Sequence, residues 1–261
     1  IYIMGKFNYT TNITGRRSIS TRRAIYRRSS SKDCCYRTHY KMQRLVDKTL
    51  SPITIIEPIS VGSKPKILCL HGGGQSVSSF RYQLLDLMNA LPEFEFVFAK
   101  TPEDKNVWIR DPPGGKGEPT TESDWAIKSH LYLDNIVSQE GPFYAILGFS
   151  QGVAMILSYL AYLQENNSKL YFDKVILLNG YMPYTHQGIT SSINKLNTST
   201  FMYKVVGEKD EFYELGTKLY NELKLENKNL NLEIYKDTAL WHFPVMKGYL
   251  SFNKVVEFIL K

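Results

Sequence analysis

The chain of 261 residues contains only three cysteines, and none of its apolar runs approaches the length of a membrane span. Cys34 and Cys35 are adjacent and Cys69 lies in an apolar run, so the three give no disulfide framework and favour a reducing compartment. A membrane-spanning helix needs about 18 apolar residues in succession, and the longest apolar stretches here have the length of a strand. Apolar residues nevertheless make up 43% of the sequence, which predicts a globular protein with a sizeable core and no membrane span.

Acidic residues are almost absent from residues 1–45, which hold eleven Lys or Arg and a single acid, Asp33. The net charge of this segment is +10, whereas the other 216 residues hold 21 basic and 24 acidic side chains and carry −3. The formal net charge of +7 therefore comes from the N-terminal segment. The rest of the chain shows no sign of a nucleic-acid surface.

The N-terminal segment has little apolar periodicity, so we expect a disordered arm over residues 1–45. A basic, Ser-rich and acid-poor composition is typical of a mitochondrial or plastid transit peptide, and the lack of an apolar run after the charges excludes a secretory signal. The alternatives are a plain disordered tail, an imperfect gene model (the first residue is Ile1), or an arm that binds RNA or an anionic membrane. The predicted organisation is this arm, a linker at 46–63 and one folded domain at 64–261. The predicted location is cytoplasmic, or organellar if the arm is a transit peptide.

From Pro65 onwards, short apolar runs alternate with helical patterns. We expect strands at Lys66–Leu70, Phe94–Ala99, Phe143–Leu147, Lys174–Leu178, Phe201–Val206 and Leu232–Tyr235. Helical patterns are expected at Phe80–Leu91, at Val153–Leu160 and, with Pro244 near the first turn, at Val245–Ile259. Strands that are apolar throughout and alternate with helices indicate an α/β fold, with a mostly parallel sheet of about six strands and helices on both faces.

Ligands of such sheets bind beyond the carboxyl ends of the strands. Two long connections fall there, Lys100–Ser123 and Asn179–Asn197. Trp108, Tyr181 and Tyr184 lie in or beside these connections, and we predict that they line an apolar pocket for substrate. Trp125 opens a helical pattern, so it is expected to pack in the ordinary way.

Residues 148–152 read Gly-Phe-Ser-Gln-Gly and match the G-x-S-x-G nucleophile elbow, in which a serine lies on a sharp turn between a strand and a helix. The glycines allow the backbone to turn and allow the helix to pack close to the strand. Ser150 is therefore the predicted nucleophile. The alternative is an ordinary Gly-rich turn.

A serine hydroxyl needs a base to take its proton, and on this fold the partners follow in the order nucleophile, acid, histidine. His242 follows the last expected strand and is the predicted base, whereas His186 precedes the acid and is expected to be a solvated loop histidine. Asp210 follows the strand at 201–206, so its carboxylate is predicted to orient His242.

Three other acids are close rivals of Asp210. Glu208 and Glu211 are its neighbours in the chain, and Asp237 follows the last expected strand. Asp237 lies so close to His242 in the sequence that we expect it to be a solvated turn residue.

The first expected strand leads into the run His71-Gly72-Gly73-Gly74. A tetrahedral intermediate carries an oxyanion that preorganised N–H groups must meet, and the amides of Gly73 and Gln151 are the predicted donors. His71 is expected to shape this loop by hydrogen bonding. No Lys-Ser/Thr pair follows the glycines and no histidine spacing fits a metal site, so neither a metal nor another cofactor is expected.

Four motifs resemble the eukaryotic family of serine hydrolases, which includes the human ovarian-cancer-associated-gene-2 type and fungal esterase and thioesterase relatives. They are Ile67–Gly72, Ala145–Gly152, Gly207–Asp210 and His242–Pro244. The resemblance covers about residues 64–261 and implies an α/β-hydrolase core without a cofactor. It implies that the residues at positions 150, 210 and 242 cleave an ester or thioester. The sequence departs from the family at the pair after Gly72, where relatives often carry a bulkier residue, and in the basic arm.

The expected partner is a small-molecule ester or thioester, and no nucleic acid is expected for the folded domain. One alternative is a non-hydrolytic ligand-binding protein on the same fold, because fold alone does not fix function. Another places the function in the basic arm, through RNA or an anionic membrane. The sequence leaves the acyl group, the choice between ester and thioester, and the oligomeric state open.

Overall fold

The computed structural model describes residues 63–261, except 116, 170 and 228–229. In this part of the chain six parallel strands form one sheet, in the order β2-β1-β3-β4-β5-β6. The strands are β1 (Lys66–Leu70), β2 (Glu95–Ala99), β3 (Ala145–Phe149), β4 (Lys174–Leu178), β5 (Phe201–Gly207) and β6 (Leu232–Asp237). The predicted parallel sheet is confirmed. The predicted arm and linker lie outside the described residues, apart from Ser63.

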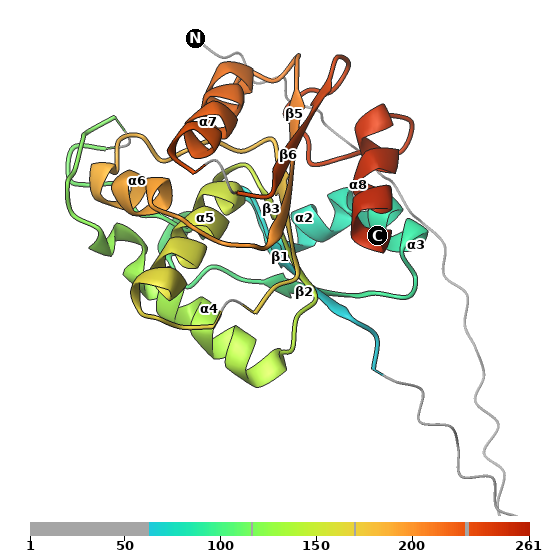
Figure 1. The fold of residues 1–261 in the computed structure, drawn as a ribbon, viewed down its shortest axis with the longest axis horizontal. Coiled ribbons are helices and arrows are strands. Elements are labelled where there is room, and N and C mark those ends of the chain that lie inside the picture. Colours follow the sequence, from blue (N-terminus) through green and yellow to red (C-terminus); the bar gives the residue numbers. More distant parts are fainter. Residues whose placement is uncertain (1–62, 116, 170, 228–229) are drawn as a thin grey trace, which may run out of the picture. The chain divides into compact units, whose positions relative to one another are not determined.

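The seven α-helices in the described residues cover both faces of the sheet (Figure 1). On one face lie α4 (Ile127–Glu140), α5 (Gln151–Glu165), α6 (Gln187–Asn194) and α7 (Tyr213–Glu226), and on the other lie α2 (Val77–Gln83), α3 (Leu85–Ala90) and α8 (Leu250–Leu260). None of the helices in the described part of the chain combines the length and the apolar character that a membrane span requires.

Side chains alternate along each strand between two apolar cores. Leu68 and Ile146 belong to the core under α4 and α5, whereas Ile67 and Leu147 belong to the core under α2, α3 and α8. Because both faces of the central strands β1, β3 and β4 are buried, these strands are almost entirely apolar and appear in the sequence as runs, whereas the edge strand β6 carries the exposed Glu233 and Lys236.

The third strand lies two residues later than predicted, at Ala145–Phe149 instead of 143–147. Gly148 does not begin the turn, because it is still paired with Leu70 of β1 and with Leu177 of β4. The strand therefore continues to the residue before Ser150.

The last helix begins at Leu250, so the prediction that it starts near Pro244 is wrong. Gly248 has φ +98°, which interrupts a helical path, and a turn closes from the Tyr249 N–H to the Met246 carbonyl. A distant residue supplies the acceptor for an N–H group in the first turn of this helix: Asp237 Oδ2 accepts the Ser251 N–H at 3.0 Å.

Asp237 is therefore a buried residue, and the expectation that it is solvated is wrong. Its Oδ1 accepts the Ala239 N–H at 3.1 Å, as a turn residue would. Burial by itself would raise the pKa of this carboxyl, but hydrogen bonds from Ser251 and from backbone N–H groups outweigh burial and lower the pKa. The ionised Asp237 carboxylate thus accepts hydrogen bonds both from the turn after β6 and from the first turn of α8.

Replacing Asp237 with Asn should lower the free energy of unfolding by about 1–2 kcal/mol at neutral pH, because an NH₂ group would replace one acceptor at the start of α8. The folded pKa of Asp237 is lowered, so this contribution is present above its unfolded pKa and is lost as pH falls through the folded pKa. Urea unfolding at neutral and acidic pH measures both effects. An Asp237→Asn protein as stable as wild type at neutral pH would contradict this role.

Candidate active site

Ser150 occupies the sharp turn between β3 and α5, with φ 54° and ψ −120°. A non-glycine residue rarely adopts this conformation, and it persists only where the surroundings hold it. A Cβ at Gly148 would lie 2.7 Å from the Gly152 carbonyl oxygen, and a Cβ at Gly152 would lie 2.4 Å from that of Leu70. Only glycine fits at either position. The two glycines therefore allow the strand and the helix to pack in close contact, with Ser150 at the tip of the turn between them.

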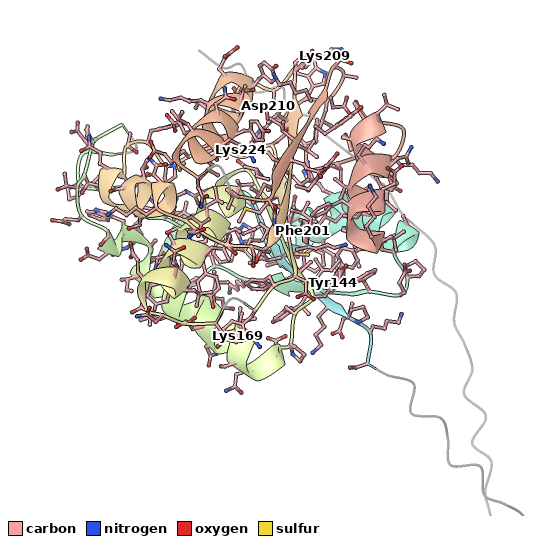
Figure 2. The ribbon with its side chains drawn as sticks, in the orientation of Figure 1. Tyr144, Lys169, Phe201, Lys209, Asp210 and Lys224 are labelled. Atoms are coloured by element: carbon pink, nitrogen blue, oxygen red, sulfur yellow. The ribbon has the colours of Figure 1, made fainter. Side chains whose placement is uncertain are left out.

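Three polar side chains meet at the carboxyl edge of the sheet. His242 Nε2 lies 3.1 Å from Ser150 Oγ, and His242 Nδ1 lies 2.8 Å from Asp210 Oδ2. The other oxygen of Asp210 accepts the Phe212 N–H at 2.8 Å, which fixes the carboxylate. The three predicted triad residues are therefore brought together from the ends of β3, β5 and β6. Figure 2 shows Asp210 at the end of the sheet opposite Phe201 and Tyr144.

Aromatic rings enclose the His242 imidazole. The ring centroids of Phe149 and Phe212 each lie 4.9 Å from that of His242. Ser150 is 8% exposed and Asp210 is 7% exposed, whereas the side chain of His242 is 27% exposed, so the two ends of the hydrogen-bonded chain are shielded from water and its middle is partly open. Shielding strengthens the interaction between the carboxylate and any positive charge on the imidazole.

Asn179, which the sequence reasoning did not single out, fixes the loop that carries His242. Its Nδ2 donates to the carbonyls of Trp241 and Phe243, at 2.9 and 2.7 Å, on either side of the histidine. Its Oδ1 accepts the Gly207 N–H at 2.7 Å, at the end of the strand that leads to the acid. Asn179 is buried and has φ 43°, a conformation that asparagine tolerates better than most residues. The only sequence signal was an Asn directly after a buried strand.

The glycine loop after β1 lies against the turn that carries Ser150. A Cβ at Gly72 would lie 3.2 Å from that of Ser150, and a Cβ at Gly73 would lie 3.1 Å from Oε1 of Gln151. The Gly72 N–H is bonded to Gln75 Oε1 and the Gly74 N–H to the Asn106 carbonyl.

By contrast, the N–H groups of Gly73 and Gln151 have no hydrogen-bond partner among the described residues. These are the two amides that the sequence predicts as oxyanion donors. Two free donors beside the Ser150 hydroxyl are able to meet a developing negative charge.

His71 supports this loop from within the core. The residue is 1% exposed, its ring lies 5.0 Å from that of Trp108, and its Nδ1 donates to the Gly72 carbonyl at 2.8 Å. Burial lowers the pKa of His71, against a smaller effect of the bond to Gly72, so the ring is neutral at physiological pH. The loop-shaping role expected of His71 agrees with these contacts.

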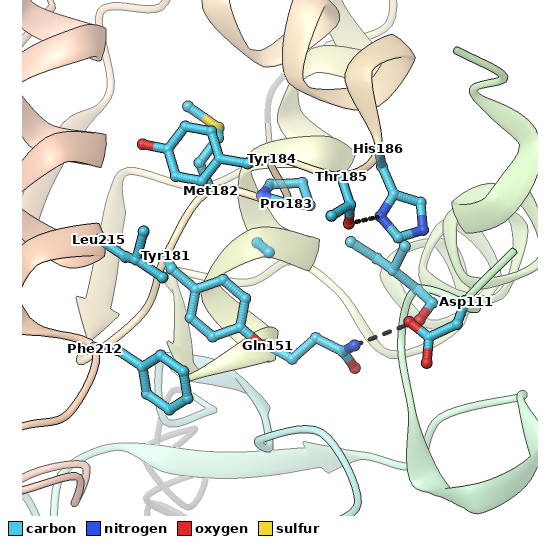
Figure 3. A pocket seen from close by; sticks show the side chains of 12 residues that line it. Asp111, Gln151, Tyr181, Met182, Pro183, Tyr184, Thr185, His186, Phe212 and Leu215 are labelled. Atoms are coloured by element: carbon cyan, nitrogen blue, oxygen red, sulfur yellow. Dashed lines mark hydrogen bonds between the residues drawn. The ribbon is translucent and has the colours of Figure 1, made fainter. Parts of the chain in front are cut away.

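A cleft of about 240 Å³ opens beside Ser150, and its walls are mainly apolar (Figure 3). Tyr181 and Tyr184 line it, as predicted, with Phe212 packed 5.3 Å from the Tyr181 ring. Burial raises the pKa of Tyr181 and the charge of Asp111 adds to the rise, whereas a hydrogen bond with Ser150 opposes it. The phenol is therefore neutral and faces both Ser150 and the cleft.

Trp108 does not line the cleft, so that part of the prediction is wrong. The side chain is completely buried, and its Nε1 donates to the His71 carbonyl at 2.8 Å. The Trp108 N–H donates to Gln151 Oε1 at 2.8 Å. The Trp108 indole therefore supports the glycine loop, and the Trp108 backbone N–H supports the turn that carries Ser150. Trp125 is half-buried and packs against the core, as expected.

His186 is buried and not solvated, which corrects the expectation for this residue. Its Nε2 lies 2.8 Å from the Arg110 carbonyl, which joins the two long connections. The Thr120 N–H also donates to the Thr185 carbonyl at 2.8 Å, and the Gln187 N–H donates to that of Thr120 at 2.7 Å. The connections thus form one wall of the cleft. Among the described residues, no three His, Cys, Asp or Glu side chains gather in a way that could hold a metal ion.

The protein has the α/β-hydrolase fold. Two features define this class here, the parallel six-stranded sheet with helices on both faces and the serine at a strained turn between strand and helix. Residues 59–234 match the model of the family described as "Serine hydrolase (FSH1)", which is about two thirds of the chain. The chain belongs to this family. The match includes Ser150 and Asp210 and ends before His242, whose position comes from the geometry.

Curated relatives are fungal esterases. The chain is 37% identical over 103 residues to esterase alnB of Emericella nidulans, covering 37% of this chain and 36% of the relative. It is 30% identical over 149 residues to esterase claE of Penicillium crustosum, covering 46% of this chain and 56% of the relative. The chain thus spans from about a third to just over half of the length of these relatives.

Solved structures agree on the fold. The Zea mays acyl-protein thioesterase 2 superposes with a TM-score of 0.58 at 17% identity, covering 76% of this chain and 93% of that one. Arabidopsis thaliana SOBER1 gives a TM-score of 0.56 at 19% identity, covering 76% and 99%. At these identities the likeness concerns the fold alone.

Proposed function

We propose that this protein hydrolyses a carboxylic ester or thioester through an acyl intermediate on Ser150, with His242 as general base and Asp210 as its orienting acid. The observation that carries the proposal is the continuous chain of short contacts, 3.1 Å from Ser150 Oγ to His242 Nε2 and 2.8 Å from His242 Nδ1 to Asp210 Oδ2. Membership of the serine hydrolase family supports it. The esterase names of the fungal relatives support the class of substrate.

The reaction follows from this geometry. His242 Nε2 takes the hydroxyl proton as Ser150 Oγ attacks the acyl carbon, and the carbonyl oxygen becomes an oxyanion. The free N–H groups of Gly73 and Gln151 hold that oxyanion. The imidazolium then gives its proton to the leaving alcohol or thiol, which leaves an acyl-Ser150. Water, activated by His242, attacks the acyl-enzyme and releases the carboxylic acid and the free serine.

The apolar cleft is the proposed acyl site, because Gln151, the residue after Ser150, lies in its wall and the rest of the wall is largely aromatic and aliphatic. A series of p-nitrophenyl esters and acyl-thioesters of graded chain length tests this proposal. We expect measurable turnover, with one chain length preferred. Turnover of none of these substrates, together with no labelling by a fluorophosphonate, would favour a non-hydrolytic binder on the same fold.

Asp111 is expected to make the cleft reject anionic acyl groups. Asp111 is exposed at the cleft wall, and no ion pair involves its carboxylate in the part of the chain that the structure describes. Asp111→Asn should therefore raise kcat/KM for p-nitrophenyl hemisuccinate relative to p-nitrophenyl butyrate by about threefold to tenfold at low salt.

The matched control is Asp104→Asn, which removes an exposed acid of the same connection that does not line the cleft. It should leave the ratio of the two substrates unchanged. High salt should shrink the effect of Asp111→Asn, because the charge is exposed. Equal ratios in wild type and Asp111→Asn at low salt would exclude this role.

A further inference from the structure

Two peptide units meet at Gly72, and hydrogen bonds occupy three of their four polar groups. The His71 carbonyl accepts the Trp108 Nε1–H at 2.8 Å, and the Gly72 N–H donates to Gln75 Oε1 at 3.1 Å. The Gly72 carbonyl accepts two hydrogen bonds, from the Gln75 N–H at 3.1 Å and from His71 Nδ1 at 2.8 Å. The fourth group, the Gly73 N–H, has no partner among the described residues.

This free N–H is one of the two oxyanion donors of the proposed reaction. A peptide unit is planar and trans, so its N–H points away from its C=O. The two donors on the Gly72 carbonyl therefore fix the direction of the Gly73 N–H on the opposite side. Gly74 has φ +76°, the value that the third residue of a type II turn needs, and the Gln75 N–H closes this turn on the Gly72 carbonyl. Such a turn does not use the N–H of its second residue, which leaves Gly73 with a free donor.

Gln75 supplies two of the four hydrogen bonds that hold these peptide units, one through its side chain and one through its backbone. Its Nε2 also donates to Oε1 of Gln83, at the end of α2, at 2.6 Å. The Gln75 amide is therefore held at its oxygen and at its nitrogen. Both glutamines are half-buried, which limits competition from water. Neither residue belongs to the proposed triad or lines the acyl cleft.

We propose that Gln75 is a positioning residue of the oxyanion site, which ties down the Gly72 N–H so that the Gly73 N–H meets the oxyanion of the acyl intermediate. Gln83 orients the Gln75 amide. This inference rests on the proposed function and assigns neither glutamine a contact with substrate. Gly72 is buried, and a buried N–H without an acceptor is costly. Loss of the Gln75 amide should therefore make the peptide units rearrange and move the Gly73 N–H.

Gln75→Ala removes the side-chain acceptor and keeps the backbone bond to the Gly72 carbonyl. An oxyanion donor acts in the transition state and not on the bound ester, so kcat and kcat/KM for a p-nitrophenyl ester should fall together. Loss of one such donor typically costs about 10²-fold to 10³-fold in kcat. Because Gln75→Ala displaces the donor without deleting it, we expect a loss of about tenfold to hundredfold, with KM changed by less than about twofold.

Ser76→Ala is the matched control, because Ser76 is the next residue and caps α2. The Ser76 hydroxyl accepts the Ser79 N–H at 3.2 Å and makes no hydrogen bond to the glycine loop in the part of the chain that the structure describes. Ser76→Ala should lower Tm by about 2–4 °C and keep wild-type kcat. An equal loss of kcat in Ser76→Ala and Gln75→Ala would assign the effect to fraying of α2 and overturn the proposal. Wild-type kcat in a folded Gln75→Ala protein would overturn it as well.

Gln83→Met removes the acceptor of the Gln75 Nε2–H and leaves the bond between Gln75 and Gly72. The Gln75 amide is then held at one end only, so kcat should fall by about threefold to tenfold, less than in Gln75→Ala. Thermal unfolding of both variants checks that they are folded. An unchanged kcat in Gln83→Met would overturn the part of the proposal that concerns Gln83.

Replacing the acyl oxygen of the substrate by sulfur probes the oxyanion site itself. Sulfur accepts hydrogen bonds more weakly than oxygen, so wild type should hydrolyse an ester faster than the matching thionoester. Gln75→Ala should narrow this preference by about threefold or more, because the donor that distinguishes the two atoms is displaced. A lower kcat with an unchanged preference would show damage elsewhere in the site and overturn the role of Gln75.

Hydrogen exchange tests the contact without turnover. In protein labelled with ¹⁵N-glycine, the Gly72 amide proton should exchange about tenfold faster or more in Gln75→Ala, and at the wild-type rate in Ser76→Ala. Equal rates in Gln75→Ala and wild type would overturn the contact between Gln75 and Gly72. If the rates differ as expected but wild type hydrolyses no ester, the proposed function fails and the contact stands, so the two failures are distinguishable.

Discussion

Ser150→Ala should lower kcat for the best ester substrate by about 10⁴-fold or more and abolish labelling by a fluorophosphonate. The reason is that, within the part of the chain that the structure describes, Ser150 Oγ is the hydroxyl in hydrogen-bond contact with His242 Nε2, at 3.1 Å. The free amides of Gly73 and Gln151 would remain, so a small residual rate over the uncatalysed reaction is expected. Thermal unfolding should be close to that of wild type, because serine and alanine are similarly strained at φ 54°.

The chain offers a matched control for this experiment. Ser158 Oγ lies 2.9 Å from His130 Nε2, so a second serine–histidine pair exists within the described residues. Burial lowers the pKa of His130 to about 4, its ring stacks on Tyr162, and no carboxylate bonds to its other nitrogen in the described part of the chain. Such a histidine is a weak base, because neither water nor a carboxylate stabilises its protonated form.

Ser158→Ala should therefore label and turn over like wild type. Labelling that survives in Ser150→Ala and disappears in Ser158→Ala would show that the nucleophile is Ser158 and not Ser150. Loss in both variants, with both folded, would show that the change at Ser158 acts through the packing of α5.

The fold and the place of Ser150 could be predicted because their signals are local. Each strand is a short apolar run, and the two glycines around Ser150 are required by contacts within the same strand–turn–helix unit. The carboxyl ends of parallel strands lie at one edge, so residues that follow β3, β5 and β6 were expected to lie near each other. Order along the chain and position after a strand carried this part of the inference.

The errors concern polar residues whose partners are far away in the chain. His186 was expected in solvent because it lies in the long Asn179–Asn197 loop and precedes the acid, yet it bonds to the Arg110 carbonyl, 76 residues earlier. Asp237 accepts the N–H of Ser251, which a pattern of apolar spacing does not reveal. A buried polar group must find partners, but the sequence does not say which loops will supply them.

Trp108 and Asn179 illustrate the same limit in the site itself. An indole in a long loop near the sheet edge fits a cleft wall as well as a core position, and the burial of Trp108 and its bond to the His71 carbonyl distinguish the two. Asn179 acts through three backbone groups, at Trp241, Phe243 and Gly207, that have no sequence signature. Side chains that position others are therefore harder to predict than side chains that react.

Asp210→Asn should lower kcat by about 10³-fold to 10⁴-fold with little change in stability. Asp210 Oδ1 accepts the Phe212 N–H at 2.8 Å, and the amide oxygen of asparagine can keep that bond. The amide NH₂ would then replace Oδ2 and point at His242 Nδ1, so Nδ1 must accept a hydrogen bond. The imidazole proton would move to Nε2, which faces Ser150 and could no longer take the hydroxyl proton.

Steady-state kinetics of Asp210→Asn and Glu208→Gln together test whether position 210 carries the acid. Glu208 is exposed and only two residues earlier, so its neutral variant should keep wild-type kcat. The rate of fluorophosphonate labelling should fall in Asp210→Asn by a factor similar to kcat, because the same proton transfer activates Ser150 in both reactions. Loss of kcat in Glu208→Gln with near-normal kcat in Asp210→Asn would move the acid to position 208 and require the 2.8 Å contact between Asp210 and His242 to be rearranged in the working enzyme.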